Sequence, residues 1–294
     1  MTLEQLRIFI AVAEEQHVTR AAERLNLTQS AASAAIAALE TRYNTRLFDR
    51  VGRGIVLTQT GRIFLAEAKA VVARAKAAEQ ALDDLAGLRH GKLSIAASQT
   101  VANYWLPPRL PAFQAAYPGI GLQVHIANTE AVAQLVHDGA ADIGFVEGEV
   151  DDPVLSVRRI EGDTLAIVVG NRHPWAKLRA FDPKLLTSAG WVLREPGSGT
   201  RSMFEAALRK YGLKLSNLEI RLELPSNEAV RNAVETGEYA TAISDVVVAR
   251  ALAAKRLHRV PLKLPARPYF VLRHRERHLG SAAAALLAAF GLSH

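Results

Sequence analysis

The chain has 294 residues, of which 49% are hydrophobic, and its formal net charge is +7 at pH 7. This length allows a small head and two compact lobes, each with its own core, and the positive charge suits a polyanionic partner. The absence of cysteine excludes disulfides and thiol chemistry. No run of about 18 apolar residues occurs and the first residues are not typical of a signal peptide, so we expect a cytoplasmic protein with no membrane partner.

A stretch near the N-terminus has the spacing of a helix-turn-helix. A short helix is expected from about Arg20 to Leu25 with Thr19 as its cap, and Asn26 tolerates the left-handed conformation of a sharp turn. Thr28 then caps a second helix over Gln29 to Glu40. The residues expected on the buried side are Ala21, Ala22, Leu25, Ala32, Ile36 and Leu39.

The exposed face of the second helix begins with Gln29, Ser30 and Ser33. In this motif the N-terminal turn of the second helix enters the major groove, where short polar side chains reach base edges. The Gln29 amide has the geometry to read adenine with both of its polar atoms, and the serines can contact bases or phosphates. An ordinary helical hairpin is the alternative for this stretch taken alone.

A basic β-hairpin is expected directly after these helices. Residues 42–62 contain five arginines and one aspartate. Two short strands, 47–50 and 55–58, flank Gly52-Arg53-Gly54, whose glycines permit the turn. A basic wing beside a recognition helix grips the flanking DNA backbone. The full set of expected DNA-contacting residues is Thr28, Gln29, Ser30, Ala31, Ser33, Arg50 and Arg53.

Several short motifs of the first sixty or so residues occur together in a fixed order: Ala21-Ala22 with Leu25, Thr28 to Ser33, Leu39-Glu40, Leu47-Phe48 with Arg50, and Leu57-Thr58 with Gly61. In this order and spacing they resemble the LysR-type transcriptional regulators. The sequence departs from the family at Ala34 and Ala35, where members often carry an Arg or Lys and a Gln. The resemblance implies a homodimeric or homotetrameric regulator that binds double-stranded DNA at a dyad-symmetric promoter site and contacts RNA polymerase.

The segment after Gly61 is rich in alanine and contains no glycine or proline until Gly87. Its apolar residues alternate steps of four and three, which is typical of a heptad seam. We therefore expect a dimerisation helix over 59–87 that follows the DNA-binding domain, 1–58; a single amphipathic helix packed on its own domain is the alternative. The seam residues are Phe64, Ala68, Val71, Ala75, Ala78, Leu82 and Leu85.

From residue 88 to the end, strands alternate with helices, which predicts two α/β units with parallel sheets. Expected elements include a helix over Tyr104 to Tyr117, opened near Pro107-Pro108, and a strand over Leu165 to Val169. The resemblance extends to this part and implies a type 2 periplasmic-binding-protein fold, with two Rossmann-like lobes, a ligand cleft between them, and crossovers near 160–164 and 264–269. Lobe I would comprise about 92–161 and 267–294, and lobe II about 162–266.

Two loops are candidates for ligand binding. Ser98-Gln99-Thr100 follows the first strand of lobe I, at the edge where ligands bind in open α/β sheets. The loop 195–201 precedes a helix of lobe II and offers two glycines, two hydroxyls, free helix-start amides and the charge of Arg201, which together can hold an anion without a metal. A plain glycine turn capped by a threonine is the alternative. The complete expected effector site is Ser98, Gln99, Thr100, Glu147, Gly197, Ser198, Gly199, Thr200, Arg201 and Asn227.

We therefore expect an effector that is a small anion, either an inorganic oxyanion such as sulfite, sulfate or phosphate or a small carboxylate. No catalytic residues, metal or cofactor are expected, because arginines surround His274 and His278, and the sequence has no nucleophile elbow or Walker motif. An enzyme or ligand-binding protein on the two-lobed fold and a DNA-binding architectural protein without a ligand are the alternatives. The stretch 250–278 has nine Lys or Arg and one Glu; we take it mostly as solvated surface, with a second contact to DNA or an acidic partner as the minority view.

Overall fold

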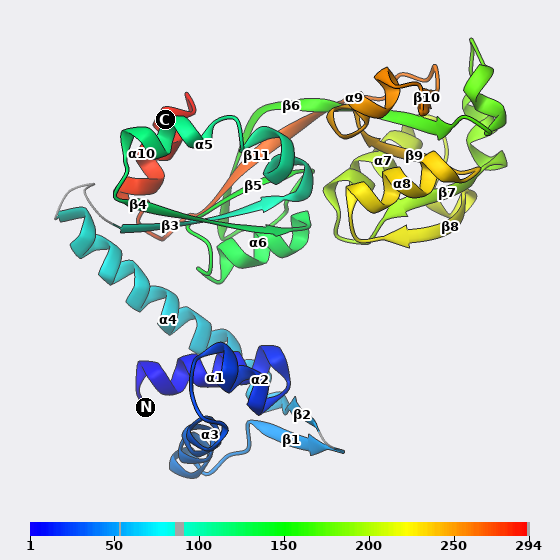
Figure 1. The fold of residues 1–294 in the computed structure, drawn as a ribbon. Helices are drawn as coiled ribbons and strands as arrows, with labels where there is room; N and C mark the ends of the chain where they lie inside the picture. The colour runs from blue at the N-terminus through cyan, green and yellow to red at the C-terminus, as the bar shows by residue number, and fades with distance from the viewer. Residues whose placement is uncertain (53, 86–90, 293–294) are drawn as a thin grey trace. The chain divides into compact units, whose positions relative to one another are not determined.

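The computed structural model describes residues 1–52, 54–85 and 91–292. Contacts within the chain divide it into two units, Met1–Leu85 and Ala86–His294, which we call the head and the effector part (Figure 1). Among the described residues no helix combines the length and the apolar character needed to cross a membrane.

The head is a winged helix-turn-helix, as predicted. Its core is built around Phe9, whose ring lies 5.4 Å from that of Phe48 and 4.8 Å from that of Phe64. The wing is an antiparallel hairpin in which Phe48 pairs with Leu57. The elements of the head are α1 (Leu3–Glu15), α2 (Val18–Arg24), α3 (Gln29–Tyr43), β1 (Phe48–Val51), β2 (Gly54–Leu57) and α4 (Gln59–Leu85).

The turn between α2 and α3 has the expected geometry. Asn26 has φ +55°, in the left-handed region, and the Thr28 hydroxyl accepts the Ala31 amide at 3.2 Å. The expected start of α2 was wrong, because the cap is His17 rather than Thr19. The imidazole of His17 accepts the Arg20 amide at 3.4 Å, so the helix begins two residues earlier than predicted.

The first turns of helix α4 pack against the core of the head. Ala68 is buried, and the partly buried Phe64 packs against the core that α1 also lines. These two seam residues therefore belong to the core of the head, as the alternative of an amphipathic helix packed on its own domain requires. Farther along, Val71 is 43% exposed and Leu82 is 68% exposed. The side chain of Leu85 lies outside the described part of the chain. Among the described seam residues, the large apolar side chains are therefore exposed from Val71 onward.

The effector part contains one nine-stranded sheet rather than two separate ones. Pairs inside each lobe are parallel, as expected, but the two strands that join the lobes run antiparallel to each other and to their neighbours. The strand order is β4 (Ile120–Ala127), β3 (Gly91–Ser98), β5 (Ile143–Glu147), β11 (Ala266–His274), β6 (Leu155–Gly170), β9 (Ala240–Ser244), β7 (Gly190–Arg194) and β8 (Glu219–Leu224), with β10 (Leu257–Arg259) paired to β6.

Helices cover both lobes of this sheet (Figure 1). Lobe I carries α5 (Leu110–Ala116), α6 (Thr129–His137) and α10 (Ser281–Ala289), and lobe II carries α7 (Gly199–Lys210), α8 (Asn227–Thr236) and α9 (Asp245–Ala253). Short helical turns occupy Val101–Trp105, Pro174–Lys177, Pro183–Ser188 and Leu215–Asn217.

Strands β6 and β11 pass from one lobe to the other, close to the predicted crossovers (Figure 1). Their register runs from Ala266 opposite Thr164 to His274 opposite Leu155. The strand expected over 165–169 is only the buried end of the 16-residue β6. Its first half includes the exposed Arg158 and Arg159, so the sequence there lacks the apolar run that marks a buried strand.

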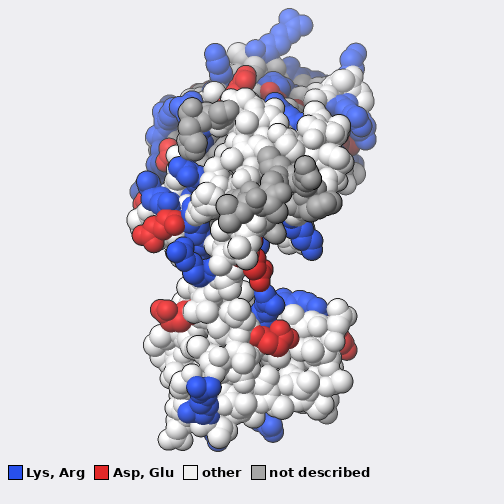
Figure 2. Space-filling model, turned by 90° about the vertical axis from the view of Figure 1, so that its left-hand side faces the viewer, with Lys and Arg blue, Asp and Glu red and all other residues white. Residues whose placement is uncertain are grey.

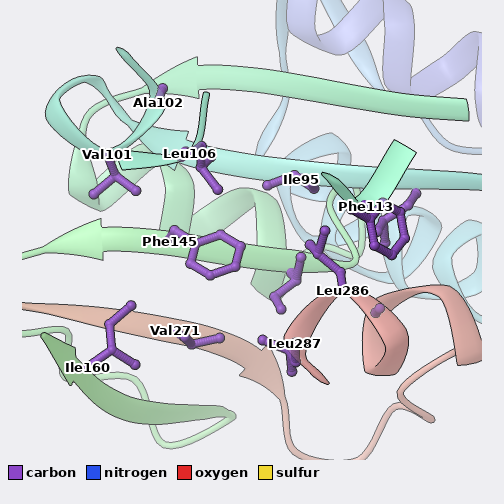
Figure 3. Close-up of a cluster of buried hydrophobic side chains, with 14 of the residues drawn as sticks. Ile95, Val101, Ala102, Leu106, Phe113, Phe145, Ile160, Val271, Leu286 and Leu287 are labelled. Carbon is purple, nitrogen blue, oxygen red and sulfur yellow. The ribbon is translucent and has the colours of Figure 1, made fainter. Parts of the chain in front are cut away.

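The core of lobe I lies between its sheet and helices α5 and α10. Figure 3 shows Phe145 of β5 and Val271 of β11 directed toward Leu286 and Leu287 of α10. The helix expected over Tyr104 to Tyr117, opened near Pro107-Pro108, is a π-helical turn over Val101–Trp105 followed by α5. Pro107 and Pro108 cause the break, because proline lacks an amide hydrogen and clashes with the preceding turn.

The core of lobe II is centred on Trp191. Its ring lies 4.9 Å from that of Phe204 on α7, and its indole N–H donates to the Leu186 carbonyl at 2.9 Å. This packing holds β7 against α7, the two elements that flank the second predicted ligand loop.

Candidate effector site and DNA-reading face

The first turn of α3 presents the predicted DNA-contacting residues at the surface of the head. Gln29, Ser30 and Ala31 are exposed and Ser33 is half-buried. The Gln29 amide nitrogen donates to the Ser33 hydroxyl at 2.9 Å, and the hydroxyls of Thr28 and Ser30 are 3.0 Å apart. The Gln29–Ser33 bond orients the glutamine along the helix and leaves its carbonyl oxygen available as an acceptor.

Arg50 is exposed on β1 of the wing, in register with Ile55 of β2. The prediction for Arg53 falls outside the described residues. The head therefore presents a polar helix start and an arginine of the wing, which are the two kinds of group that base reading and backbone contact require.

Substitutions at Gln29 and Arg50 should separate these two kinds of contact. We expect Gln29→Ala to cost about 1–3 kcal/mol on cognate DNA and to relax discrimination at one base position. Arg50→Ala should weaken all sequences alike and reduce the slope of log affinity against log salt by about one unit. Fluorescence anisotropy on cognate and random duplexes measures both effects. Equal losses on the two duplexes for Gln29→Ala would refute its base-reading role, and Arg24→Ala, on the preceding helix and paired with Glu14, is the charge control.

At the centre of the effector part lies the carboxylate of Glu147, the last residue of β5. Glu147 is only 1% exposed, and hydroxyls from both lobes surround its carboxylate. Ser98 donates to Oε2, while Thr100 of lobe I and Thr200 of lobe II each lie 3.4 Å from Oε1. Two of the predicted loops thus meet on one buried carboxylate.

Two buried arginines orient these hydroxyls. Arg267, which is fully buried, donates to the Thr200 hydroxyl at 2.9 Å and lies 3.7 Å from Glu147 Oε1. Arg194 donates to Asn227 Oδ1 at 2.7 Å, and the Asn227 amide nitrogen donates to the Thr100 hydroxyl at 3.1 Å. Because Thr100 and Thr200 each accept a hydrogen bond, their own protons are directed toward Glu147.

Arg267 is held by a second carboxylate on the neighbouring crossing strand. Its guanidinium makes two hydrogen bonds to Asp163, at 2.6 and 2.5 Å. Burial opposes the charged form of Arg267, but Glu147 and Asp163 outweigh it and raise the pKa of the guanidinium above its ordinary value. Burial, and next the Asp163 carboxylate, raise the pKa of the adjacent Tyr269. Arg267 therefore stays cationic between two acids.

The two lobes touch through glycine backbone beside this cluster. A Cβ placed on Gly199 would lie 1.8 Å from the Glu147 carbonyl oxygen and 2.5 Å from the Thr129 hydroxyl. Gly148 has φ +91°, and a Cβ there would lie 3.0 Å from the Gly199 Cα. The Gly197 carbonyl also accepts the Glu130 amide of lobe I at 3.2 Å. Only glycine allows this approach.

The start of α7 has an unsatisfied donor beside the cluster. Ser198 is 2% exposed, and its hydroxyl forms no hydrogen bond within the described chain. No side chain caps the first amides of α7. A buried hydroxyl without a partner costs free energy, so a ligand that bonds to it would recover that cost.

The structure brings together nine of the ten predicted effector-site residues. Gln99 joins the lobes. Its side-chain oxygen accepts the backbone N–H of Asn227 at 2.9 Å, and its side-chain nitrogen donates to the Pro225 carbonyl at 2.8 Å. Arg201 does not face the cluster as expected. Its guanidinium instead binds Glu205 and Glu223 and donates to the Arg194 carbonyl at 3.0 Å.

The positive charge that the prediction assigned to Arg201 comes from Arg267, and the sequence analysis missed Arg267, Asp163 and Arg194. The basic stretch 250–278 was taken as mostly solvated surface, but this interpretation was wrong for Arg267. Its only sequence signal is its position inside a predicted crossover, next to Pro268. Figure 2 shows other Lys and Arg side chains spread over the visible face of the effector part.

Comparison with known proteins assigns both parts of the chain. Residues 3–62 match the family described as bacterial regulatory helix-turn-helix protein, lysR family, and residues 86–291 match the LysR substrate binding domain. The chain belongs to the LysR family. It is 33% identical over 284 residues to the HTH-type transcriptional regulator YeiE of Escherichia coli (strain K12), covering 96% of this chain and 94% of YeiE.

Solved structures of LysR-type regulators share the fold. Full-length CbnR complexed with its target DNA aligns with a TM-score of 0.67 at 20% identity, covering 98% of each chain. The regulatory domain of CcmR from Synechocystis PCC6803, in complex with 2-PG, aligns with a TM-score of 0.62 at 22% identity, covering 69% of this chain and 98% of that domain. This chain is accordingly a DNA-binding transcriptional regulator with an effector-binding domain, not an enzyme.

Proposed function

We propose that the effector of this LysR-type regulator is a small anion, an inorganic oxyanion or a small carboxylate, held between the two lobes. The buried cluster of Thr100, Thr200 and Arg267 carries the proposal, because its donors converge on one oxygen of a carboxylate. An effector that binds the closed lobes better than the open ones shifts the population toward closure and changes DNA binding. The regulator would act in the cytoplasm and contact RNA polymerase.

Two further observations support an anion. The first amides of α7 and the unpartnered Ser198 hydroxyl are hydrogen-bond donors at the same place as the cluster. The related CcmR regulatory domain has been solved with 2-PG bound. We therefore propose Ser98, Gln99, Thr100, Gly197–Thr200 and Asn227 as the effector-contacting residues, with Arg267 in place of Arg201.

A panel of anions should identify the class by stabilisation of the protein. At a hundredfold excess over its dissociation constant, a bound anion should add about 2.7 kcal/mol to the free energy of unfolding. Thermal unfolding with sulfite, sulfate, phosphate and small carboxylates at matched ionic strength measures this.

The valine variants Thr100→Val and Thr200→Val preserve side-chain shape and should reduce the shift. Thr187→Val should not reduce the shift, because within the described residues the Thr187 hydroxyl bonds to the nearby Lys184 carbonyl alone. A neutral or cationic metabolite that stabilises the chain while every anion fails to do so would overturn the proposal.

We also propose that α4 pairs with α4 of a second chain along its outer half. Val71 and Leu82 are exposed apolar residues of this helix, and Ala78 between them is small and exposed. Small residues allow two helices to approach closely. A dimer formed in this way presents two heads to the two halves of a dyad site.

Glutamate at Ala75 and Ala78 should disrupt this pairing by crowding and like-charge repulsion. We expect light scattering to show a lower mass and dyad DNA to bind more weakly. Ala66→Glu/Ala70→Glu places two charges on exposed positions of the same helix and is the matched control. Unchanged mass and DNA affinity in the Ala75/Ala78 variant would show that the seam is elsewhere.

A further inference from the structure

The two lobes are closed on each other, and their contact seals the cluster around Glu147. Glu147, Thr200 and Asn227 are each at most 1% exposed. A solute can therefore reach these groups only when the lobes separate. The free energy that holds the lobes together then sets how often an effector can enter, so the polar contacts between the lobes are candidates for a regulatory role.

One of these contacts joins Asn128 of lobe I to Glu195 of lobe II, and we call these two residues the interlobe pair. The Asn128 side-chain nitrogen donates to Glu195 Oε1 at 3.2 Å and lies 3.5 Å from the Pro196 carbonyl oxygen. Both members are half-buried. The pair lies next to the sealed cluster, because Thr129, which follows Asn128, donates from its hydroxyl to the Glu147 carbonyl at 2.7 Å.

Each member of the interlobe pair is held in place by its own lobe. The Asn128 side-chain oxygen accepts the Ala131 amide at 2.9 Å and so caps α6, which leaves the side-chain nitrogen directed at lobe II. The Glu195 carboxylate accepts two hydrogen bonds from Arg194, at 2.8 and 2.9 Å. Burial opposes ionisation of Glu195, but Arg194 outweighs it and lowers the pKa of the carboxyl group. A fixed donor thus faces a fixed negative charge.

Two backbone amides report directly on the separation of the lobes. Glu130 and Asn227 lie in the first turns of α6 and α8, where an amide has no partner within its own helix. The Glu130 amide instead donates to the Gly197 carbonyl at 3.2 Å, and the Asn227 amide donates to the Gln99 side-chain oxygen at 2.9 Å. Both bonds cross from one lobe to the other, so both amides lose their protection from exchange when the lobes part.

We propose that the interlobe pair holds the lobes closed before an effector binds, and that the group at residue 128 sets the balance between closed and open lobes. This inference rests on the proposed function for its regulatory meaning, because an effector between the lobes acts through that balance. The neutral donor of Asn128 attracts the Glu195 carboxylate and favours closure. A carboxylate at residue 128 would repel it at a half-buried position, where like charges are poorly screened, and would favour opening.

Asn128→Asp tests the inference, because aspartate caps a helix as well as asparagine does but turns an anionic oxygen toward Glu195. We expect the Glu130 and Asn227 amides of the full chain to exchange with deuterium at least about tenfold faster than in the parent chain. Mass spectrometry with fragmentation to single residues measures the rates in the absence of added anion. Amides of β3, inside lobe I, should keep the parent rates, which distinguishes separation of the lobes from unfolding.

Three further variants isolate the cause. Asn217→Asp makes the same change in lobe II, where the side chain accepts the nearby Lys214 amide at 2.7 Å, and should leave both rates unchanged. Asn128→Asp/Glu195→Gln places an amide donor opposite the new carboxylate and should restore most of the protection. Asn128→Ser also caps the helix but lacks the amide nitrogen. It should raise both rates by a smaller factor, which tests the inference if Asn128→Asp does not fold.

The outcomes separate this inference from the proposed effector. Parent exchange rates at both amides in Asn128→Asp would overturn the role of the interlobe pair and leave the anionic effector in place. A loss of protection that the double variant does not recover would also overturn it, because the cause would then not be Glu195. Faster exchange as expected, in a chain that no anion of the panel stabilises, would support the interlobe pair and refute the proposed class of effector.

Discussion

Replacing Arg267 by methionine is expected to reduce the free energy of unfolding of the effector part by about 3–5 kcal/mol. Arg267 is fully buried and lies between Asp163 and Glu147, so its loss leaves two carboxylates in a dry site without a cation. Urea unfolding followed by tryptophan fluorescence measures the loss, because all three tryptophans of the chain lie in the effector part.

A double variant separates charge from packing in this prediction. Arg267→Met/Asp163→Asn removes one of the two stranded carboxylates and should recover part of the lost stability. Arg273→Met, on the same strand but half-buried at the surface, should cost far less. A loss of under about 1 kcal/mol for Arg267→Met, which is the ordinary range for a surface ion pair, would show that the cluster does not hold the lobes as described.

Replacing Gly199 by alanine is expected to abolish the response to the effector. A methyl group at this position would lie 1.8 Å from the Glu147 carbonyl oxygen of the opposite lobe, so the lobes must separate. The contacts that converge from both lobes on a ligand would then no longer form together. We expect anion affinity to fall by at least tenfold, which corresponds to about 1.4 kcal/mol.

Titration calorimetry of the Gly199→Ala variant measures this loss. Gly121→Ala is the control, because a Cβ there meets its nearest neighbour at 3.6 Å, an ordinary contact, and lies on the edge strand of lobe I. Anion binding by Gly199→Ala at the parent affinity would mean that lobe closure at this point is not required for the effector.

The residues that the sequence analysis placed correctly are those with a local signal. Thr28 and Asn26 are recognisable because a cap and a left-handed turn have their own residue preferences, and the structure shows both. Ser98 and Thr200 were expected to face one cleft, because each belongs to a loop between a strand and a helix, one loop in each lobe, where ligands bind in α/β sheets.

Groups that act across long sequence separations had no local signal. Arg267 and Asp163 are 104 residues apart, and only the antiparallel register of β6 and β11 brings them together. The part of β6 that leads up to Asp163 carries exposed charged residues, Arg158, Arg159 and Glu161, and Arg267 lies near the start of β11 beside Pro268. A buried charge in such a segment looks like surface charge, which is why Arg267 was taken as solvated.

The error in the start of α2 has a different, local cause. Histidine is not among the preferred capping residues, whereas threonine is, so the sequence favoured Thr19 over His17. In the structure the His17 backbone is extended and its ring nitrogen takes the acceptor role. Thr19 instead lies inside the first turn.

The most direct test of anion-controlled DNA binding is the coupling between the two ligands. Duplexes selected by the parent chain from a random pool provide a cognate site, and fluorescence anisotropy measures their affinity with and without saturating phosphate at matched ionic strength. We expect phosphate to change the affinity at least about fivefold, DNA to change phosphate affinity by the same factor, and Thr200→Val to lose both effects. Cognate affinity that stays the same with and without every anion of the panel, in a chain shown to bind that DNA specifically, would contradict regulation by an anion between the lobes.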